Sequence, residues 1–243
     1  MAQGLQLHRF VSIRPTRRAV GWLLTALIAS LLAGGTASAG TILIDFNDAS
    51  TAGFGWNTFH AGNDGTTQGL IWDDGTASGI SLTLPTFNDS GNPGWNPGNP
   101  LPSWAPASVA NDYSFFNAFF DGGSQTAQFV FSGLDATSLY TIDIISSRNL
   151  NRDQDFTITH GGGVEFYDDW NTQTDGWVAG NVLTFSGLTA DGANQIVMDL
   201  RREGASAAFN AIRVTSTPEP STFTFTALGL VILAARRRSG RRS

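Results

Sequence analysis

The chain has 243 residues, with 20 acidic residues against 14 basic ones, and it contains neither cysteine nor lysine. Of the 14 arginines, four precede residue 40 and five follow residue 235, so five arginines face 19 acids in the segment 40–217, which holds every acid except Glu219. Such an acidic surface repels phosphate backbones, which excludes nucleic acid as a partner, and the missing cysteines exclude disulfide bonds as the source of stability.

The N-terminal segment has the pattern of a signal peptide. Arg14 and the pair Arg17-Arg18 precede an apolar run over residues 19–33, and Ala37-Ser38-Ala39 follows as a small-residue cleavage site. The arginine pair also resembles a twin-arginine signal, but no cofactor motif requires export in the folded state, so the general secretory route is favoured. We therefore predict a signal helix within residues 1–39. A signal anchor is the alternative, against which the small residues before the cleavage site argue.

Alternating apolar residues are the main signal between residues 40 and 216. Ile42, Ile44 and Phe46 share one face of a short run, and similar runs of about four to eight residues recur between turn-forming residues. The runs lie at 41–46, 128–131, 139–144, 156–158, 181–185, 196–200 and 209–214. A glycine-rich hairpin turn is expected at 159–164. The pattern predicts an all-β domain over residues 40–216, an antiparallel β-sandwich of the jelly-roll type.

Several short segments of this domain resemble exported bacterial jelly-roll modules of the galactose-binding-like fold. The segments are Ile44-Asp45-Phe46, Gly55-Trp56-Asn57, Asp73-Asp74-Gly75-Thr76, Phe131-Ser132-Gly133-Leu134-Asp135 and Phe209–Val214. In that fold the first and last strands come together, so the resemblance implies that 42–46 lies beside 210–214. It also implies sugar binding, as an expectation from fold type alone, because no ligand-contact motif matches residue by residue.

A segment rich in Pro, Gly and Asn interrupts the strand pattern from Phe87 to Ala107. Proline has no backbone donor, so this segment is predicted as a long loop that forms no interior strand. Loops of this length are often functional or disordered.

Tryptophans in this loop and elsewhere are the candidate residues for binding carbohydrate. Trp95, Trp104 and Trp170 lie among Gly, Pro, Asn and Asp, which indicates exposed positions, and Arg148 and Asn149 follow a predicted strand. Aromatic faces stack on the apolar faces of sugars, while arginine and asparagine donate hydrogen bonds to hydroxyl groups. The alternative is that these tryptophans fold back as lids over the ends of the sandwich.

A structural calcium ion is the candidate metal. Asn151, Asp153 and Asp155 alternate in one short segment, and hard cations prefer carboxylate and amide oxygens. The segment is no EF-hand, because the sixth position from Asn151 is Phe156, where that loop needs glycine. The galactose-binding-like resemblance implies a calcium ion in a loop. Turn formation is the alternative role for these residues, and no other cofactor is indicated.

Catalytic chemistry is not indicated by any motif. The segment 40–217 offers only His60 and His160, and the chain has no nucleophile-elbow or zinc-protease pattern. Glycoside hydrolysis needs two carboxylates flanking the scissile bond, whereas the only glutamates of this segment are Glu165 and Glu203. Most aspartates adjoin Gly or Asn, where they form turns. We therefore predict a non-enzymatic protein, with a polysaccharide-active enzyme as an alternative.

The C-terminal residues 217–243 are predicted to form a sorting tail. Pro218-Glu219-Pro220 is followed by an uncharged run over 221–235 and by Arg236-Arg237-Arg238, an order that resembles the PEP-CTERM tail of exported proteins in Gram-negative bacteria. The resemblance implies cleavage by an exosortase, a membrane protease. As a helix the uncharged run spans about 22 Å, against about 30 Å of hydrocarbon, which favours transient membrane tethering. Snorkelling arginines that extend a permanent span are the alternative.

These patterns predict an exported protein, tethered at the inner membrane and then located at the cell surface or in the extracellular matrix. The leading hypothesis is a non-enzymatic β-sandwich that contacts extracellular polysaccharide. A structural protein of the surface or matrix, which assembles without affinity for glycans, is the first alternative. A polysaccharide-active enzyme is the second.

Overall fold

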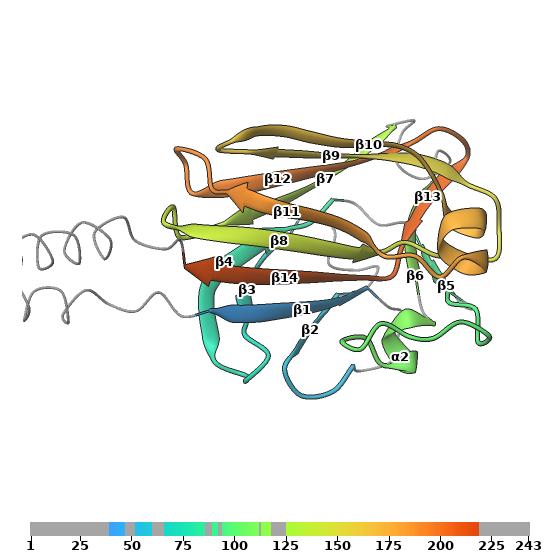
Figure 1. The fold of residues 1–243 in the computed structure, drawn as a ribbon, viewed down its shortest axis with the longest axis horizontal. Coiled ribbons are helices and arrows are strands. Elements are labelled where there is room, and N and C mark those ends of the chain that lie inside the picture. Colours follow the sequence, from blue (N-terminus) through green and yellow to red (C-terminus); the bar gives the residue numbers. More distant parts are fainter. Residues whose placement is uncertain are drawn as a thin grey trace, which may run out of the picture. The chain divides into compact units, whose positions relative to one another are not determined.

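The computed structural model describes residues 39–46, 52–59, 66–85, 89–91, 94–111, 113–117 and 125–218. These residues belong to one compact unit, Ala37–Glu219. Its antiparallel sheets pack as a sandwich, so the predicted fold class is confirmed (Figure 1). The predicted signal helix and the apolar helix of the tail lie outside the described residues. Within the described ranges, no helix is both long and apolar enough to cross a membrane.

One layer is a five-stranded sheet in the order β11-β8-β14-β1-β2. Its strands are β1 (Gly40–Phe46), β2 (Trp56–Phe59), β8 (Ser138–Ile145), β11 (Leu183–Thr189) and β14 (Ala211–Pro218). Neighbours are antiparallel except for β1 and β2, which are parallel. The predicted pairing of the first and last strands is confirmed, because Ile42 lies opposite Val214 and Ile44 opposite Ile212.

The other layer is a six-stranded antiparallel sheet in the order β10-β9-β12-β7-β4-β3. Its strands are β3 (Thr67–Ile71), β4 (Ala77–Thr83), β7 (Thr126–Ser132), β9 (Asp153–His160), β10 (Gly163–Asn171) and β12 (Gln195–Arg202). The predicted hairpin joins β9 to β10, and Gly163 has a φ of 138°, which side chains rarely adopt. Strand β10 is one of the two edges of this sheet.

A small third sheet, β13-β6-β5, completes the strands. It consists of β5 (Asp89–Gly91), β6 (Tyr113–Asn117) and β13 (Ser206–Phe209). The helices among the described residues are α2 (Ala107–Ala110) and the π-helix η1 (Thr172–Val178). Two expectations are corrected here. Strand β5 lies inside the segment predicted as a loop, at the edge of its sheet. The run predicted at 209–214 breaks at Asn210, whose buried side chain accepts from Ser147 N and donates to Ala110 O.

Three phenylalanines from three different sheets meet in the main core. Phe46 of β1 packs edge-on against Phe209 of β13, with ring centroids 4.7 Å apart, and against Phe129 of β7 at 5.8 Å. Phe129 and Phe209 are themselves 5.1 Å apart and edge-on. Each such pair stabilises a protein by about 0.5–1.5 kcal/mol beyond the area that it buries. The triad therefore ties the small sheet to both layers of the sandwich.

A second apolar cluster forms where residues 94–110 fold back on the five-stranded sheet. Trp95 is 1% exposed and packs in this cluster with Val109, Ala110, Ile145 and Ala211. Half-buried tryptophans at positions 56 and 104 pack against the same cluster. The loop is thus held by its own apolar side chains, as the lid interpretation of the sequence expects.

Replacing Trp95 by alanine should lower the free energy of unfolding by about 3 kcal/mol, because it leaves a cavity in the second cluster. Urea unfolding followed by circular dichroism measures this loss. Phe54→Ala is the control, since Phe54 is 83% exposed and its removal should change stability little. A loss below about 0.5 kcal/mol for Trp95→Ala, the range of ordinary surface substitutions, would contradict the packing of this loop.

Candidate functional site

The six-stranded sheet turns one face to the core and the other to solvent. On β9, Phe156 and Ile158 are buried, so Thr157 and Thr159, which alternate with them, point away from the core. We call the solvent side the outer face. It carries Val164 and Phe166 of β10, Thr157 and Thr159 of β9, Val197 and Asp199 of β12, and Gln128 of β7, which the strand register places in neighbouring positions.

Two apolar side chains of the edge strand stand out on the outer face. Phe166 lies opposite Thr157 and is 58% exposed, while Val164 lies opposite Thr159 and is 64% exposed. Single exposed apolar residues are common on protein surfaces, but here a phenyl ring and an isopropyl group share one face of one strand. Together they offer solvent an apolar strip beside hydroxyl, amide and carboxylate groups.

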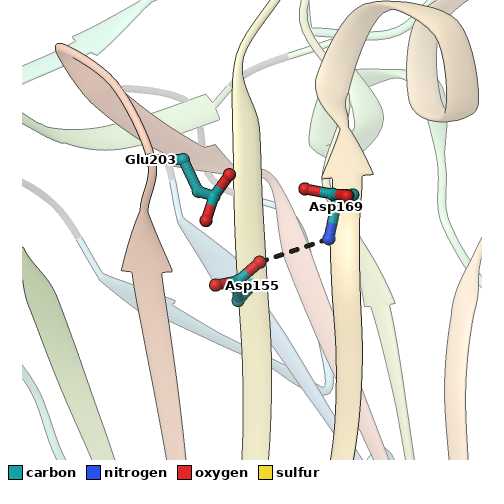
Figure 2. A group of neighbouring side chains, drawn as sticks. All are labelled: Asp155, Asp169 and Glu203. Atoms are coloured by element: carbon teal, nitrogen blue, oxygen red, sulfur yellow. Dashed lines mark hydrogen bonds between the residues drawn. The ribbon is translucent and has the colours of Figure 1, made fainter.

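Next to Phe166 along the strands, three carboxylates come together (Figure 2). Asp155 lies on β9, Asp169 on β10, and Glu203 directly follows β12. Each contributes one oxygen to a set in which all oxygens lie within 4.8 Å of one another. We call these three residues the acidic group. It brings together residues that are up to 48 positions apart in the sequence.

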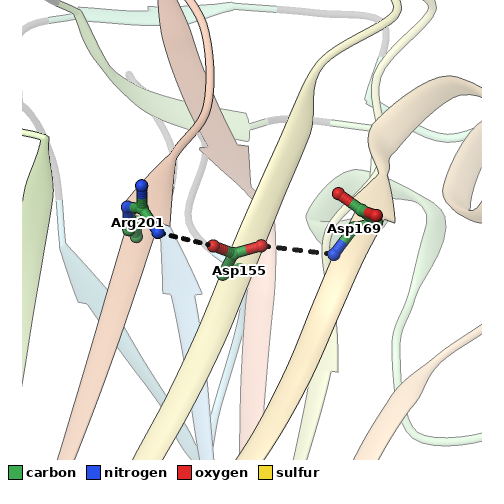
Figure 3. A network of polar contacts seen from close by, with 3 residues as sticks. All are labelled: Asp155, Asp169 and Arg201. Atoms are coloured by element: carbon green, nitrogen blue, oxygen red, sulfur yellow. Dashed lines mark hydrogen bonds and ion pairs between the residues drawn. The ribbon is translucent and has the colours of Figure 1, made fainter.

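Asp155 is the buried member of the acidic group, and its charge is compensated from both neighbouring strands (Figure 3). Arg201, its register partner on β12, donates through Nη1 to Oδ2 at 3.4 Å. The backbone N–H of Asp169 on β10 donates to Oδ1 at 3.2 Å. A carboxylate that is 1% exposed would be costly without such partners. These bonds therefore join three strands at the edge of the sheet.

A β-bulge in β10 explains why acids crowd this place. The register with β9 shifts between Tyr167 and Trp170, so that two residues of β10, Asp168 and Asp169, lie opposite the single residue Asp155. Asp169 has a φ of 57°, in the left-handed region that aspartate tolerates better than most residues. The bulge turns Trp170 into the core while the two aspartates stay exposed.

The carboxylates of this region repel one another. The negative charge of Asp155, followed by desolvation and the charge of Asp169, raises the pKa of Glu203 above its ordinary value, and Arg201 opposes this shift. Desolvation and the charge of Asp169 likewise raise the pKa of Asp168. Ionised carboxylates are thus held close together on the surface, where a cation would relieve their repulsion.

The acidic group also has the donor set of a hard-cation site. Calcium binds oxygens at about 2.3–2.6 Å, so oxygens within 4.8 Å of one another can share one ion. Arg201 competes with such an ion, because it already neutralises Asp155. Exposed acidic groups are common without an ion, so the spacing alone assigns no metal.

The residues predicted to bind calcium are divided by the structure. Asp155 belongs to the acidic group, whereas Asn151 and Asp153 both accept hydrogen bonds from the side-chain amide of Asn171, that of Asp153 at 2.6 Å. Asn171 in turn caps η1, since its Oδ1 accepts from the backbone N–H groups of residues 173 and 174. Asn151 and Asp153 therefore orient a helix cap, and calcium binding at the three predicted residues stays a prediction.

The expectation that the candidate tryptophans are exposed is wrong for two of the three. Trp95 and Trp170 are 1% and 2% exposed, and the indole N–H of Trp170 donates to Ser146 O at 2.8 Å. Trp104 is half-buried, stacked on Trp56 with the guanidinium of Arg213 at 5.1 Å from its ring centroid. Burying a large apolar ring stabilises the fold more than exposing it does, which overrides the polar sequence context.

The polar members of the predicted ligand set also have partners within the fold. The guanidinium of Arg148 lies 4.7 Å from the centroid of the Tyr113 ring. Asn149 is exposed and accepts a hydrogen bond of 3.4 Å from Gln173 Nε2. Neither residue shares the outer face with Phe166. Sequence reasoning missed that face because Phe166 follows Glu165 in an ordinary strand pattern, which gives no sign of which side becomes buried.

Comparisons with known proteins identify no family for this chain. No family model matches this chain, and no curated protein matches it. Among solved structures it is similar to the enzymatically active domain of tailspike protein 4 of bacteriophage CBA120, at 12% identity and a TM-score of 0.29, covering 56% of this chain and 19% of that one. It is also similar to CpGH89CBM32-6 of Clostridium perfringens, at 13% identity and a TM-score of 0.27, covering 56% of this chain and 93% of that one.

The matched region is thus a small part of the tailspike domain, 19% of its length. At such identities and TM-scores these likenesses do not decide function. The chain is an antiparallel β-sandwich, and what it does has to be inferred from its own surface.

Replacing Glu203 by glutamine should stabilise the protein at neutral pH in the presence of a chelator. Because its pKa is raised in the folded state, ionised Glu203 destabilises the fold. This destabilisation is complete at pH values above the folded pKa and disappears below the ordinary pKa of 4.5. The gain should therefore shrink as the pH falls towards that value. Thermal unfolding across this pH range measures it, with Glu165→Gln, a second exposed glutamate of the same domain, as the matched control.

The same pair of variants tests the calcium prediction. Bound calcium would raise the melting temperature of the wild type and reverse the order of wild type and Glu203→Gln, because the glutamine removes one charged ligand. Equal responses of the wild type and both variants to calcium would contradict a calcium site at the acidic group. A Glu203→Gln variant less stable than the wild type in chelator would contradict the repulsion itself.

Proposed function

We propose that this chain is an exported, non-enzymatic β-sandwich that contacts polysaccharide through the outer face of its six-stranded sheet. The observation that carries the proposal is Phe166, a phenyl ring that is 58% exposed on the outer face, beside Val164, which is 64% exposed. A phenyl ring is normally buried in the core of a protein. Its exposure on a strand is therefore consistent with a surface that binds a ligand.

A pyranose ring presents an apolar C–H face and a rim of hydroxyl groups, and the outer face offers a counterpart to both. Phe166 and Val164 supply the apolar strip. Beside them, Thr157 offers a hydroxyl, and the Gln128 amide donates to Asp199 Oδ1 at 3.0 Å, which fixes an acceptor and a donor on the adjacent strands. Neighbouring strands lie about 4.8 Å apart, so Thr157 lies about 5 Å from Phe166 and Gln128, three strands away, about 14 Å, a span that suits an extended chain of sugar rings.

The geometry of β10 favours this role over assembly by edge pairing. An exposed edge strand with apolar side chains is a template for pairing with another chain. The bulge at Asp168 and Asp169 interrupts β10, and like charges would face each other across a copy. Bulges and charges of this kind are what natural edge strands use to prevent such pairing. Assembly without glycan affinity is therefore the second candidate function.

The proposed cellular location of the protein is inferred from its sequence alone. The signal peptide and the sorting residues Glu219, Pro220 and Arg236–Arg238 lie outside the described residues, while Pro218 ends β14. Export, tethering at the inner membrane, processing by an exosortase and a final position at the cell surface or in the matrix are proposed from the tail pattern. A polysaccharide-rich surrounding of this kind would supply the ligand.

Phe166→Ala should weaken binding to an immobilised polysaccharide about two- to thirteenfold, the effect of losing an aromatic contact of about 0.5–1.5 kcal/mol. Phe54→Ala is the matched control: Phe54 is 83% exposed and lies against Gly75 in the turn between β3 and β4, at the opposite edge of the sheet. Affinity electrophoresis of the full chain through gels containing different polysaccharides measures the change.

Unchanged mobility of Phe166→Ala in a gel that retards the wild type would contradict the outer face as the binding surface. A wild type that no polysaccharide retards, but that scatters light as an ordered assembly, would favour the structural alternative. Trp104→Ala tests the binding position that was predicted from the sequence. Trp104 packs against the second apolar cluster, on the five-stranded sheet, so this substitution should leave binding unchanged.

A further inference from the structure

The outer face has a strong charge asymmetry close to Phe166. Asp155 is two residues from Thr157 on β9, and Asp168 is two residues from Phe166 on β10, so the carboxylates occupy the next row of the same face. The face and its end carry six carboxylates in all: Asp153, Asp155, Asp168, Asp169, Asp199 and Glu203. An occupant that contacts the phenyl ring therefore has the exposed carboxylate of Asp168 in the next row, with Asp169 and Glu203 beyond it.

Few positive charges of the protein balance them. Arg201 is the arginine of this face, and it is paired with Asp155. The other four arginines of the described residues lie elsewhere: Arg148 over Tyr113, Arg152 on Ser206, Arg202 on the carbonyl of Gly204, and Arg213 on Asp143. Among the described residues, no arginine forms an ion pair with Asp169 or Glu203. The negative charge is thus left for a partner from outside.

From this charge complementarity we infer that the polysaccharide bound by the outer face carries protonated amino groups, as a polymer of hexosamines with free amines does. The inference rests on the proposed function, since it names the class of glycan for the same face. An amino sugar combines an apolar ring face for Phe166 with an ammonium group for the carboxylates, and an ammonium group brings three hydrogen-bond donors. Uronate and sulfated polymers are excluded by the same charges.

The acids also explain why a neutral polymer is a poorer fit. Repulsion among Asp155, Asp169 and Glu203 is relieved by a cation but not by a hydroxyl group. A neutral chain would cover these carboxylates, remove water from them and leave the repulsion in place. The preference for an amine therefore comes from the ligand's charge, and the apolar strip contributes equally to both polymers.

The test compares one polymer in two chemical forms, a glucosamine polymer with free amines and the same polymer fully N-acetylated, at a pH where the amines are protonated. The full chain should bind the free-amine form at least about threefold more tightly at low salt, and the difference should diminish as salt rises. Asp169→Asn and Glu203→Gln should each reduce the preference and keep affinity for the acetylated form. Glu165→Gln is the matched control, since Glu165 lies opposite the inward-facing Ile158.

Each outcome has a distinct meaning. Equal affinity for the two forms, with Phe166→Ala still weakening both, would overturn the amine preference and leave the proposed function intact. Affinity for neither form nor for any other polysaccharide would overturn the proposed function itself. A preference that Glu165→Gln reduces as much as Glu203→Gln does would show that it follows net charge alone, which would overturn its assignment to the outer face.

Discussion

A buried carboxylate at the edge of the six-stranded sheet is the constraint on which the functional surface depends. Asp155 is almost fully buried, so its charge has to be compensated by Arg201 of β12 and by the backbone N–H of Asp169 in β10. The second bond requires the bulge in β10. The bulge in turn places Trp170 in the core and leaves two aspartates outside. One ionised side chain thus organises an edge strand that would otherwise be regular.

The same strand then presents two chemistries side by side. Before the bulge, alternation places Phe166 and Val164 on the outer face, opposite Thr157 and Thr159 of β9. At and beyond the bulge, carboxylates outnumber arginines, since Arg201 is the arginine paired there. The apolar strip and the carboxylates follow one another along the strand, so an elongated partner would bind in one orientation and a positively charged one would be preferred. Both properties suit an extended polymer of sugars better than they suit a folded protein partner.

Much of the fold follows from the sequence, because alternation of apolar residues has a direct physical cause in a two-layered sandwich. Strand β1 and the β9–β10 hairpin were predictable from residues such as Ile42, Ile44 and Gly163, whereas the pairing of β1 with β14 was expected only from the resemblance to the galactose-binding-like fold. The break at Asn210 was not, since it arises from tertiary hydrogen bonds. The positions of Trp95 and Trp170 also escaped prediction, because a polar neighbourhood in sequence does not tell which ring finds an apolar pocket. The acidic group unites three distant segments, so only the strand register reveals it.

Glycan binding on the outer face, and not around the tryptophans of the loop, is tested most directly by amide hydrogen exchange of the full chain with and without a soluble oligosaccharide. If the proposed surface binds glycan, protection should increase in β9, β10 and β12, around Thr157, Phe166 and Asp199. Protection confined to the segment that contains Trp95 and Trp104, with β10 unchanged, would contradict it.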